Sequence, residues 1–257
     1  MPGPLRELVE RAGRHQTVTL SAGLAFFGII SLAPALGLGL ALLQLLWPPE
    51  AVAVVIETLR GTFAEALGLS ALMEQVQGQA GSYLGLSLLI VLWPATTLAS
   101  GWARALDAVG EDETPPALRG LTGRIKGLGL GLGMLAGLDL VIAAVTAGTI
   151  FAGGRAVALG GVVVLVVALV FVTCLALYRW FPARRRRPWS SIWPGAAWAT
   201  AGVCVATVGF ALALQLAGSL ARRYPPALST AVVVGLWLYA ANACLLLGDE
   251  WNLMRGR

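Results

Sequence analysis

Residues 156–181 read AVALGGVVVLVVALVFVTCLALYRWF, and Arg179 is the first charged residue in this run. An α-helix rises about 1.5 Å per residue, so about 20 apolar residues cross the roughly 30 Å of hydrocarbon in a bilayer. Lipid offers no partners for backbone polar groups, and a helix satisfies these groups within one segment. The stretch therefore predicts a transmembrane helix.

The rest of the chain is also dominated by apolar residues. Hydrophobic residues make up 58% of its 257 residues and charged residues only 12%, with a mean hydropathy of +0.79. Globular proteins carry about 25% charged residues, whereas here the charges are confined to short segments between long apolar ones. This composition argues against a water-soluble protein, and we expect a single membrane domain over residues 1–257.

Six stretches are long and apolar enough to span a bilayer, which predicts an all-α polytopic bundle. They cover residues 22–46, 82–103, 127–150, 156–181, 192–217 and 228–248. The first stretch is too long for the core of a cleavable signal peptide, so we interpret it as a span. Residues 47–81 follow it with apolar positions at spacings of three and four, which predicts amphipathic external helices between spans one and two.

The basic residues predict the orientation in the membrane, because cytoplasmic loops are enriched in Lys and Arg. With the N-terminus inside, only four of the 18 basic residues fall outside: Arg60, Arg155, Arg222 and Arg223. An even number of spans returns the C-terminus to the same side. We therefore expect a multi-pass membrane protein with both termini cytoplasmic.

Asp139 lies near the middle of the third predicted span. An ionisable side chain at that depth costs about 2.5–3.5 kcal/mol on insertion scales, so it should face the interior of the bundle. Asn242, Gln215 and Ser31 are candidate partners from other spans. Two interpretations stay open, a proton or substrate site at Asp139 and a structural hydrogen bond between helices.

The last predicted span ends in LLLGDEWNLMRGR, which places Asp249, Glu250 and Asn252 near the cytoplasmic interface. Arg179, Arg255 or the run Arg184 to Arg187 could pair with these carboxylates as an interfacial latch, and such a latch is as compatible with a structural role as with a site. The single histidine, His15, lies in the charged N-terminal leader, where we expect it to be solvated.

Small residues predict close helix packing, since lipid-embedded helices associate through tight contact. The third predicted span begins GLGLGLGMLAG, and the fifth carries Gly195, Ala199, Gly202, Ala206 and Gly209. The three cysteines, Cys174, Cys204 and Cys244, lie in apolar runs without metal-ligand spacing, so we expect buried small side chains, no metal site and no cofactor.

Three strings resemble the YihY/BrkB family of bacterial inner-membrane proteins. They are LSAGLAFFGIISLAPALGL in the first span, LALYRWFPARRRRPWSSIWPGAAWA at the joint of spans four and five, and LWLYAANACLLLGDEWN at the end. The chain departs from the family pattern at Asp107 and Asp249, where Asn and Ala are usual. The resemblance implies a six-span bundle, and although some relatives carry a ribonuclease label, it defines no reaction.

The sequence contains no pattern typical of hydrolases, neither HExxH, GxSxG nor a P-loop, and we expect no enzymatic activity and no nucleic-acid partner. A helical bundle with a buried carboxylate favours a transporter or a lipid-handling protein, with membrane lipids as partners and an amphipathic or anionic envelope component as substrate. The alternative is an envelope scaffold that transports nothing. The sequence leaves the oligomeric state open.

Overall fold

The computed structural model describes residues 3–30, 97–98, 100–110, 125, 129, 155–182, 187–221 and 226–255. Apart from short turns and segment ends these residues are helical, and no strand occurs among them. The predicted all-α class is confirmed for this part of the chain. The external segment 47–81 and nearly all of the third predicted span lie outside the described residues.

Three long helices dominate the described part of the chain. They are α7 (Arg155–Trp180), α8 (Trp189–Ala221) and α9 (Pro226–Arg255). Within them Val163–Trp180, Trp189–Leu212 and Val232–Arg255 are long and apolar enough to cross a membrane. The fourth, fifth and sixth predicted spans thus coincide with helices, while the total of six spans stays a prediction.

The helices α8 and α9 extend beyond the predicted spans at 192–217 and 228–248. The apolar run that defines a predicted span measures only the crossing of the hydrocarbon. At its C-terminal end α9 continues because polar side chains there find partners inside the bundle, as Asp249 and Asn252 do in its last turns.

A short helix that the hydropathy pattern does not predict precedes the first span. This helix, α1 (Pro4–Arg14), has a proline in its first turn and arginines in its last, which suit the two ends of a helix. Gln16 then takes a left-handed conformation with a φ of 52°. The chain turns there into a second helix, Thr17–Ile30, which opens the first predicted span.

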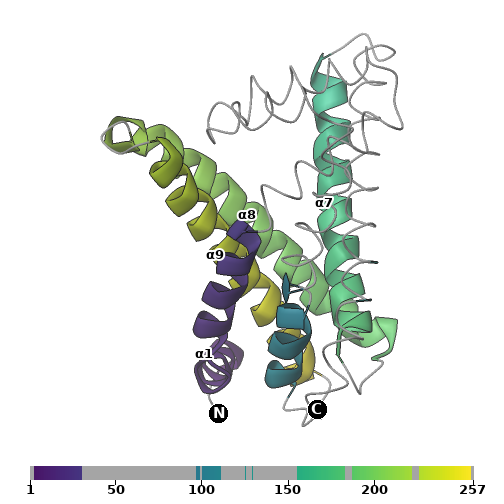
Figure 1. The fold of residues 1–257 in the computed structure, drawn as a ribbon. Coiled ribbons are helices and arrows are strands. Elements are labelled where there is room, and N and C mark those ends of the chain that lie inside the picture. Colours follow the sequence, from purple (N-terminus) through teal and green to yellow (C-terminus); the bar gives the residue numbers. More distant parts are fainter. Residues whose placement is uncertain are drawn as a thin grey trace.

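The helices converge at one end of the molecule. Figure 1 shows α8 and α9 side by side in opposite directions, whereas α7 meets α8 at one end and diverges from it toward the other. Both chain termini lie at the converging end. The side of the membrane on which this end lies stays a prediction.

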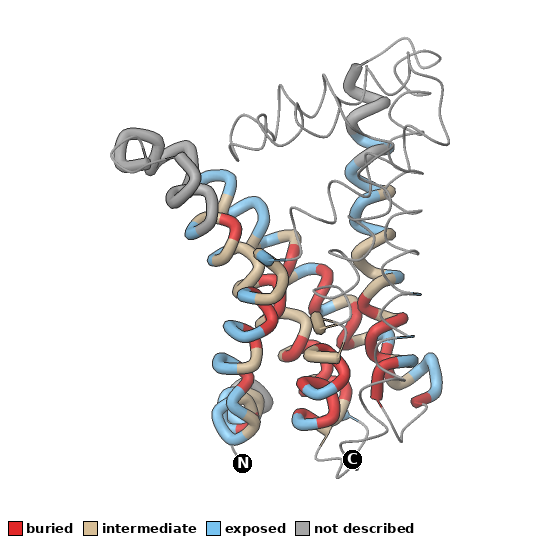
Figure 2. Tube along the Cα trace, viewed as in Figure 1, coloured by how far each residue is buried: buried red, intermediate tan, exposed pale blue. Residues whose placement is uncertain are grey.

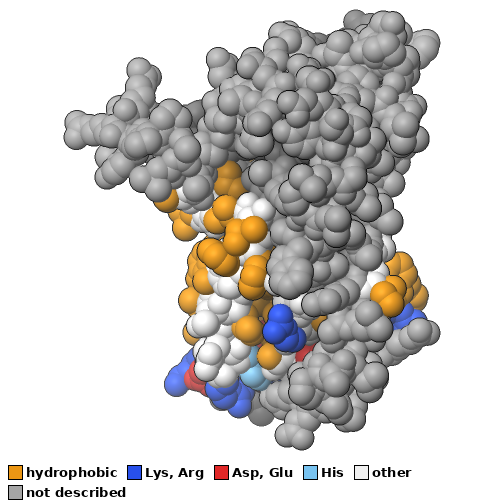
Figure 3. Space-filling model, in the orientation of Figure 1, with side chains coloured by type: hydrophobic (Ala, Val, Ile, Leu, Met, Phe, Trp, Pro, Cys, Tyr) orange, Lys and Arg blue, Asp and Glu red, His pale blue; other side chains and the backbone are white. Residues whose placement is uncertain are grey.

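Buried residues gather at the same end, as Figure 2 shows. Their apolar cluster draws on the helices at 17–30 and 100–109 and on α7, α8 and α9, and includes Leu24, Leu106, Tyr178, Ile192 and Leu246. Farther along the long helices, apolar side chains such as Val164, Val205 and Leu236 are exposed. Figure 3 shows exposed hydrophobic side chains along the described helices, as expected for surface in contact with lipid.

Small residues let α8 and α9 approach closely, as predicted for the fifth span. A Cβ atom at Gly202 would lie 2.9 Å from the sulfur of Cys244, and one at Gly195 would overlap the backbone of Gly248. The prediction is confirmed at these two glycines. It does not hold at Gly209, which is exposed and where a Cβ atom would meet no described residue outside its own helix within 4 Å.

Candidate functional site

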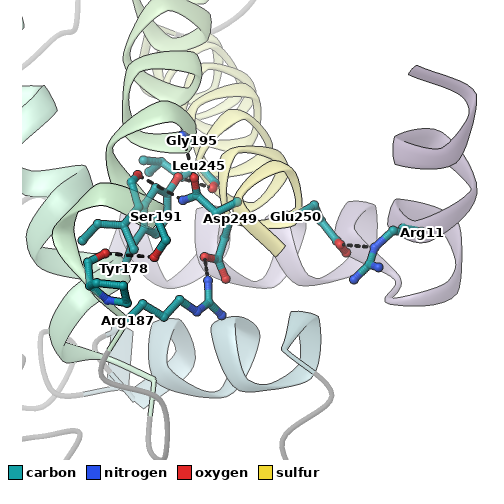
Figure 4. A network of polar contacts seen from close by, with 11 residues as sticks. Arg11, Tyr178, Arg187, Ser191, Gly195, Leu245, Asp249 and Glu250 are labelled. Atoms are coloured by element: carbon teal, nitrogen blue, oxygen red, sulfur yellow. Dashed lines mark hydrogen bonds and ion pairs between the residues drawn. The ribbon is translucent and has the colours of Figure 1, made fainter. Parts of the chain in front are cut away.

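The last turns of α9 carry three polar side chains, which contact α1, α8 and the segment just before α8. Successive residues of a helix are rotated by about 100°, so Glu250 points away from Asp249, whereas Asn252, three positions after Asp249, lies on nearly the same side as Asp249. Figure 4 shows Asp249 directed toward Arg187 and Glu250 directed toward Arg11. All three α9 side chains are buried, so this charged end is part of the packed structure.

Asp249 pairs with Arg187, which precedes the first turn of α8. An Nη1 hydrogen of Arg187 is donated to Oδ1 of Asp249 over 2.5 Å, and the two side chains are only 10% and 0% exposed. Within the described residues, the second carboxylate oxygen of Asp249 and two nitrogens of Arg187, Nε and Nη2, make no hydrogen bond. The ion pair therefore leaves three polar atoms that could form further hydrogen bonds.

Glu250, in contrast, uses both of its oxygens. Nε of Arg11 donates to Oε2 over 3.0 Å, and the ring nitrogen Nδ1 of His15 contacts Oε1. The side chains of Arg11 and Glu250 are 3% and 0% exposed. These contacts fasten the end of α1 to the end of α9.

His15 is not solvated, and that prediction is wrong. Its side chain is only 10% exposed, because α1 folds against α9 and carries the imidazole to Glu250. Hydropathy could not show this packing. The spacing of four between Arg11 and His15 was the available signal, because it puts both side chains on one face of a helical turn.

Asn252 joins α9 to the first turns of α8. Its Oδ1 accepts the backbone N–H of Gly195 over 2.7 Å, and its Nδ2 donates to the carbonyl oxygen of Ile192 over 3.1 Å. Pro194 interrupts the helical hydrogen bonding at this point because it has no N–H. The amide of Asn252 thus bonds to backbone groups of α8, whereas the predicted latch places Asn252 with the carboxylates.

Asp249 and Glu250 each form an ion pair with an arginine, but only one of these two partners is among those that the sequence suggests. Arg187 belongs to the arginine run that was expected to pair with the carboxylates, whereas Arg11 was not expected. In the part of the chain that the structure describes, Arg179 has no carboxylate partner: it donates to the backbone oxygen of Arg187, and its guanidinium lies 5.4 Å from the ring centre of Trp189. A flat guanidinium stacks well on an indole, and here it holds the backbone beside Arg187.

The predicted site around Asp139 falls largely outside the described part of the chain. Asp139 and Ser31 lie outside it, and so does the side chain of Gln215, whose backbone lies in α8. Asn242 lies on α9 and is 6% exposed. A buried carboxamide of this kind suits contact between helices, and the grouping around Asp139 stays a prediction.

Comparison with protein families found one that covers nearly the whole chain. A family model described as "Virulence factor BrkB" matches residues 8–257. Comparison with curated proteins and with solved structures found no significant match.

Proposed function

We propose that this chain, which belongs to the BrkB virulence factor family, is an inner-membrane protein that transports or otherwise handles an amphipathic lipid of the envelope. Its apolar helices are those of a membrane protein. One observation carries the proposal: a buried cluster of charged side chains lies at the end of helices whose remaining surface is apolar. An amphipathic lipid is likewise divided into a polar headgroup and apolar chains.

The geometry of this end supports a site for a polar headgroup. The pair of Arg187 and Asp249 is buried, while Trp193 and Trp198 on the neighbouring α8 are each 55% exposed. Tryptophan is enriched where a bilayer meets water. A lipid lying beside α8 would keep its chains on apolar surface and bring its headgroup level with the buried charges.

Asp139 keeps its predicted role within this proposal, as a proton-sensitive group in the third span. A carboxylate inside a bundle commonly marks a proton or substrate path. Proteoliposomes with Asp139→Asn test this part separately. Transport rates equal to those of the unchanged protein would remove Asp139 from the mechanism.

Reconstitution of the purified chain tests the proposal itself. Proteoliposomes carrying a fluorescently labelled phospholipid report its movement between leaflets when a membrane-impermeant quencher is added. We expect faster movement than in protein-free liposomes and slower movement with Asp249→Asn. Glu10→Gln is the matched control, because Glu10 pairs with Arg6 on the exposed face of α1.

The opposite result would favour the scaffold. If the rate equals that of protein-free liposomes and the purified protein binds no lipid, the proposal is wrong. A stoichiometric protein partner in the same preparation would then identify the chain as an interaction protein.

A further inference from the structure

We propose that Arg187 and Asp249 recognise a headgroup that joins a phosphate to a primary ammonium, as in phosphatidylethanolamine. This inference rests on the proposed function, since it names the class of lipid that the site takes. It starts from the bonding capacity that the pair leaves unused at the buried end of the bundle.

The unused atoms are of two kinds. Within the described part of the chain, Nε and Nη2 of Arg187 and Oδ2 of Asp249 are buried without a hydrogen-bond partner. Buried polar atoms in folded proteins almost always have partners. Glu250 on the same helix follows this rule, since both of its oxygens are engaged. Three such atoms lie together on the one ion pair of Arg187 and Asp249, and this concentration points to a ligand.

The two kinds of atom define complementary parts of that ligand. The planar fork of an arginine matches two oxygens of a phosphate. The free carboxylate oxygen of Asp249 accepts N–H donors, which a primary ammonium supplies and a quaternary ammonium lacks. A ligand that carries both groups would satisfy both side chains at once.

Charge balance favours the same ligand. Arg187 and Asp249 neutralise each other, and their side chains are 10% and 0% exposed. A purely anionic ligand would add an uncompensated negative charge beside Asp249, and a metal cation would be repelled by Arg187. A zwitterionic headgroup adds one charge of each sign and keeps the buried site neutral.

The position of the pair also suits a headgroup. Arg179 donates to the backbone oxygen of Arg187 and stacks on Trp189, which is 53% exposed. Indole side chains are typical of the membrane interface, where headgroups lie. Because the side chain of Arg187 is more exposed than that of Asp249, the phosphate would approach from the side of Arg187.

Native mass spectrometry of the detergent-solubilised full chain tests the inference. The probes are phosphatidylethanolamine, phosphatidylcholine and phosphatidylglycerol with identical acyl chains. We expect the unchanged protein to bind phosphatidylethanolamine about tenfold more tightly than phosphatidylcholine, because only the former donates hydrogen bonds to Asp249. Phosphatidylglycerol should bind more weakly, because its added negative charge is not compensated.

Two substitutions test whether the preference for phosphatidylethanolamine depends on Arg187 and Asp249. Asp249→Asn should abolish the preference for phosphatidylethanolamine over phosphatidylcholine, and Arg187→Lys should weaken both, because lysine keeps the charge but not the fork. Glu10→Gln, on the exposed face of α1, should leave both affinities unchanged. The comparison of three lipids on the unchanged protein stands even if a variant fails to fold.

Competition with water-soluble phosphoethanolamine distinguishes the two sources of this headgroup. Displacement of the lipid by the soluble compound supports recognition of the headgroup alone, and selective binding without displacement supports recognition of the membrane lipid. Equal affinity for phosphatidylethanolamine and phosphatidylcholine, or a preference that survives Asp249→Asn, would overturn the inference. Lipid movement without headgroup preference would leave the proposed function standing.

Discussion

Gly195 of α8 and Gly248 of α9 face each other so closely that neither position has room for a Cβ atom. A Cβ at Gly248 would lie 2.6 Å from both the carbonyl oxygen of Gly195 and Oη of Tyr178, and one at Gly195 would overlap the carbonyl of Gly248. The two helices therefore touch through their backbones. This crossing sets the position of Asp249 and Glu250, which directly follow Gly248.

Gly195→Ala should destabilise the protein. The added methyl group meets backbone atoms that cannot rotate away, and overpacking of this kind costs about 1–3 kcal/mol. Gly209→Ala on the same helix is the matched control, since among the described residues a Cβ atom there would contact none outside its own helix within 4 Å. Thermal unfolding in detergent measures both, and equal melting temperatures would contradict the close crossing.

Arg11→Ala should loosen α1 from α9. It leaves Glu250 as a buried charge short of its main partner, and breaking a buried ion pair costs about 3–5 kcal/mol. Arg6→Ala removes a pair whose side chains are 75% and 57% exposed, for which we expect at most about 1 kcal/mol. Limited proteolysis within α1 reports the difference. Cleavage at the same rate in both variants would show that α1 is held by other contacts.

Asn252→Ala should weaken the joint between α8 and α9. It leaves the N–H of Gly195 without its partner and removes the donor to Ile192, and a buried unsatisfied group costs about 1–3 kcal/mol. Ser191→Ala serves as the control, because its hydroxyl makes an exposed bond to the carbonyl of Pro188 that water can replace. Denaturant titration of both variants measures the loss in free energy of unfolding. A loss no larger than that of the control would be inconsistent with the observed bonds.

Reporter fusions should place both termini in the cytoplasm. The distribution of arginine predicts this orientation, and both termini lie at the same end of the molecule (Figure 1). A third fusion after Arg222, between the fifth and sixth predicted spans, should report the opposite side. Termini on opposite sides of the membrane would be incompatible with an even number of spans.

The three long helices that the structure describes were predictable, because whether a stretch is long and apolar enough to cross a bilayer depends on that stretch alone. The run at 156–181 coincides with α7 to within a residue at each end, since a helix satisfies every backbone polar group of such an apolar segment within the segment itself. Small residues at Gly195 and Gly202 likewise predicted close contact, because the absence of a side chain is itself what permits it.

The sequence by itself thus determined that apolar helices form and that polar residues gather at the end of α9. Only the tertiary structure decided which partners they meet. Arg11 and Glu250 are 239 positions apart, and no periodicity relates residues at that separation. Their contact, and the pairing of Asp249 with Arg187 instead of Arg179, depend on the angle at which helices cross. That angle follows from packing summed over many side chains, so no single stretch of the chain encodes it.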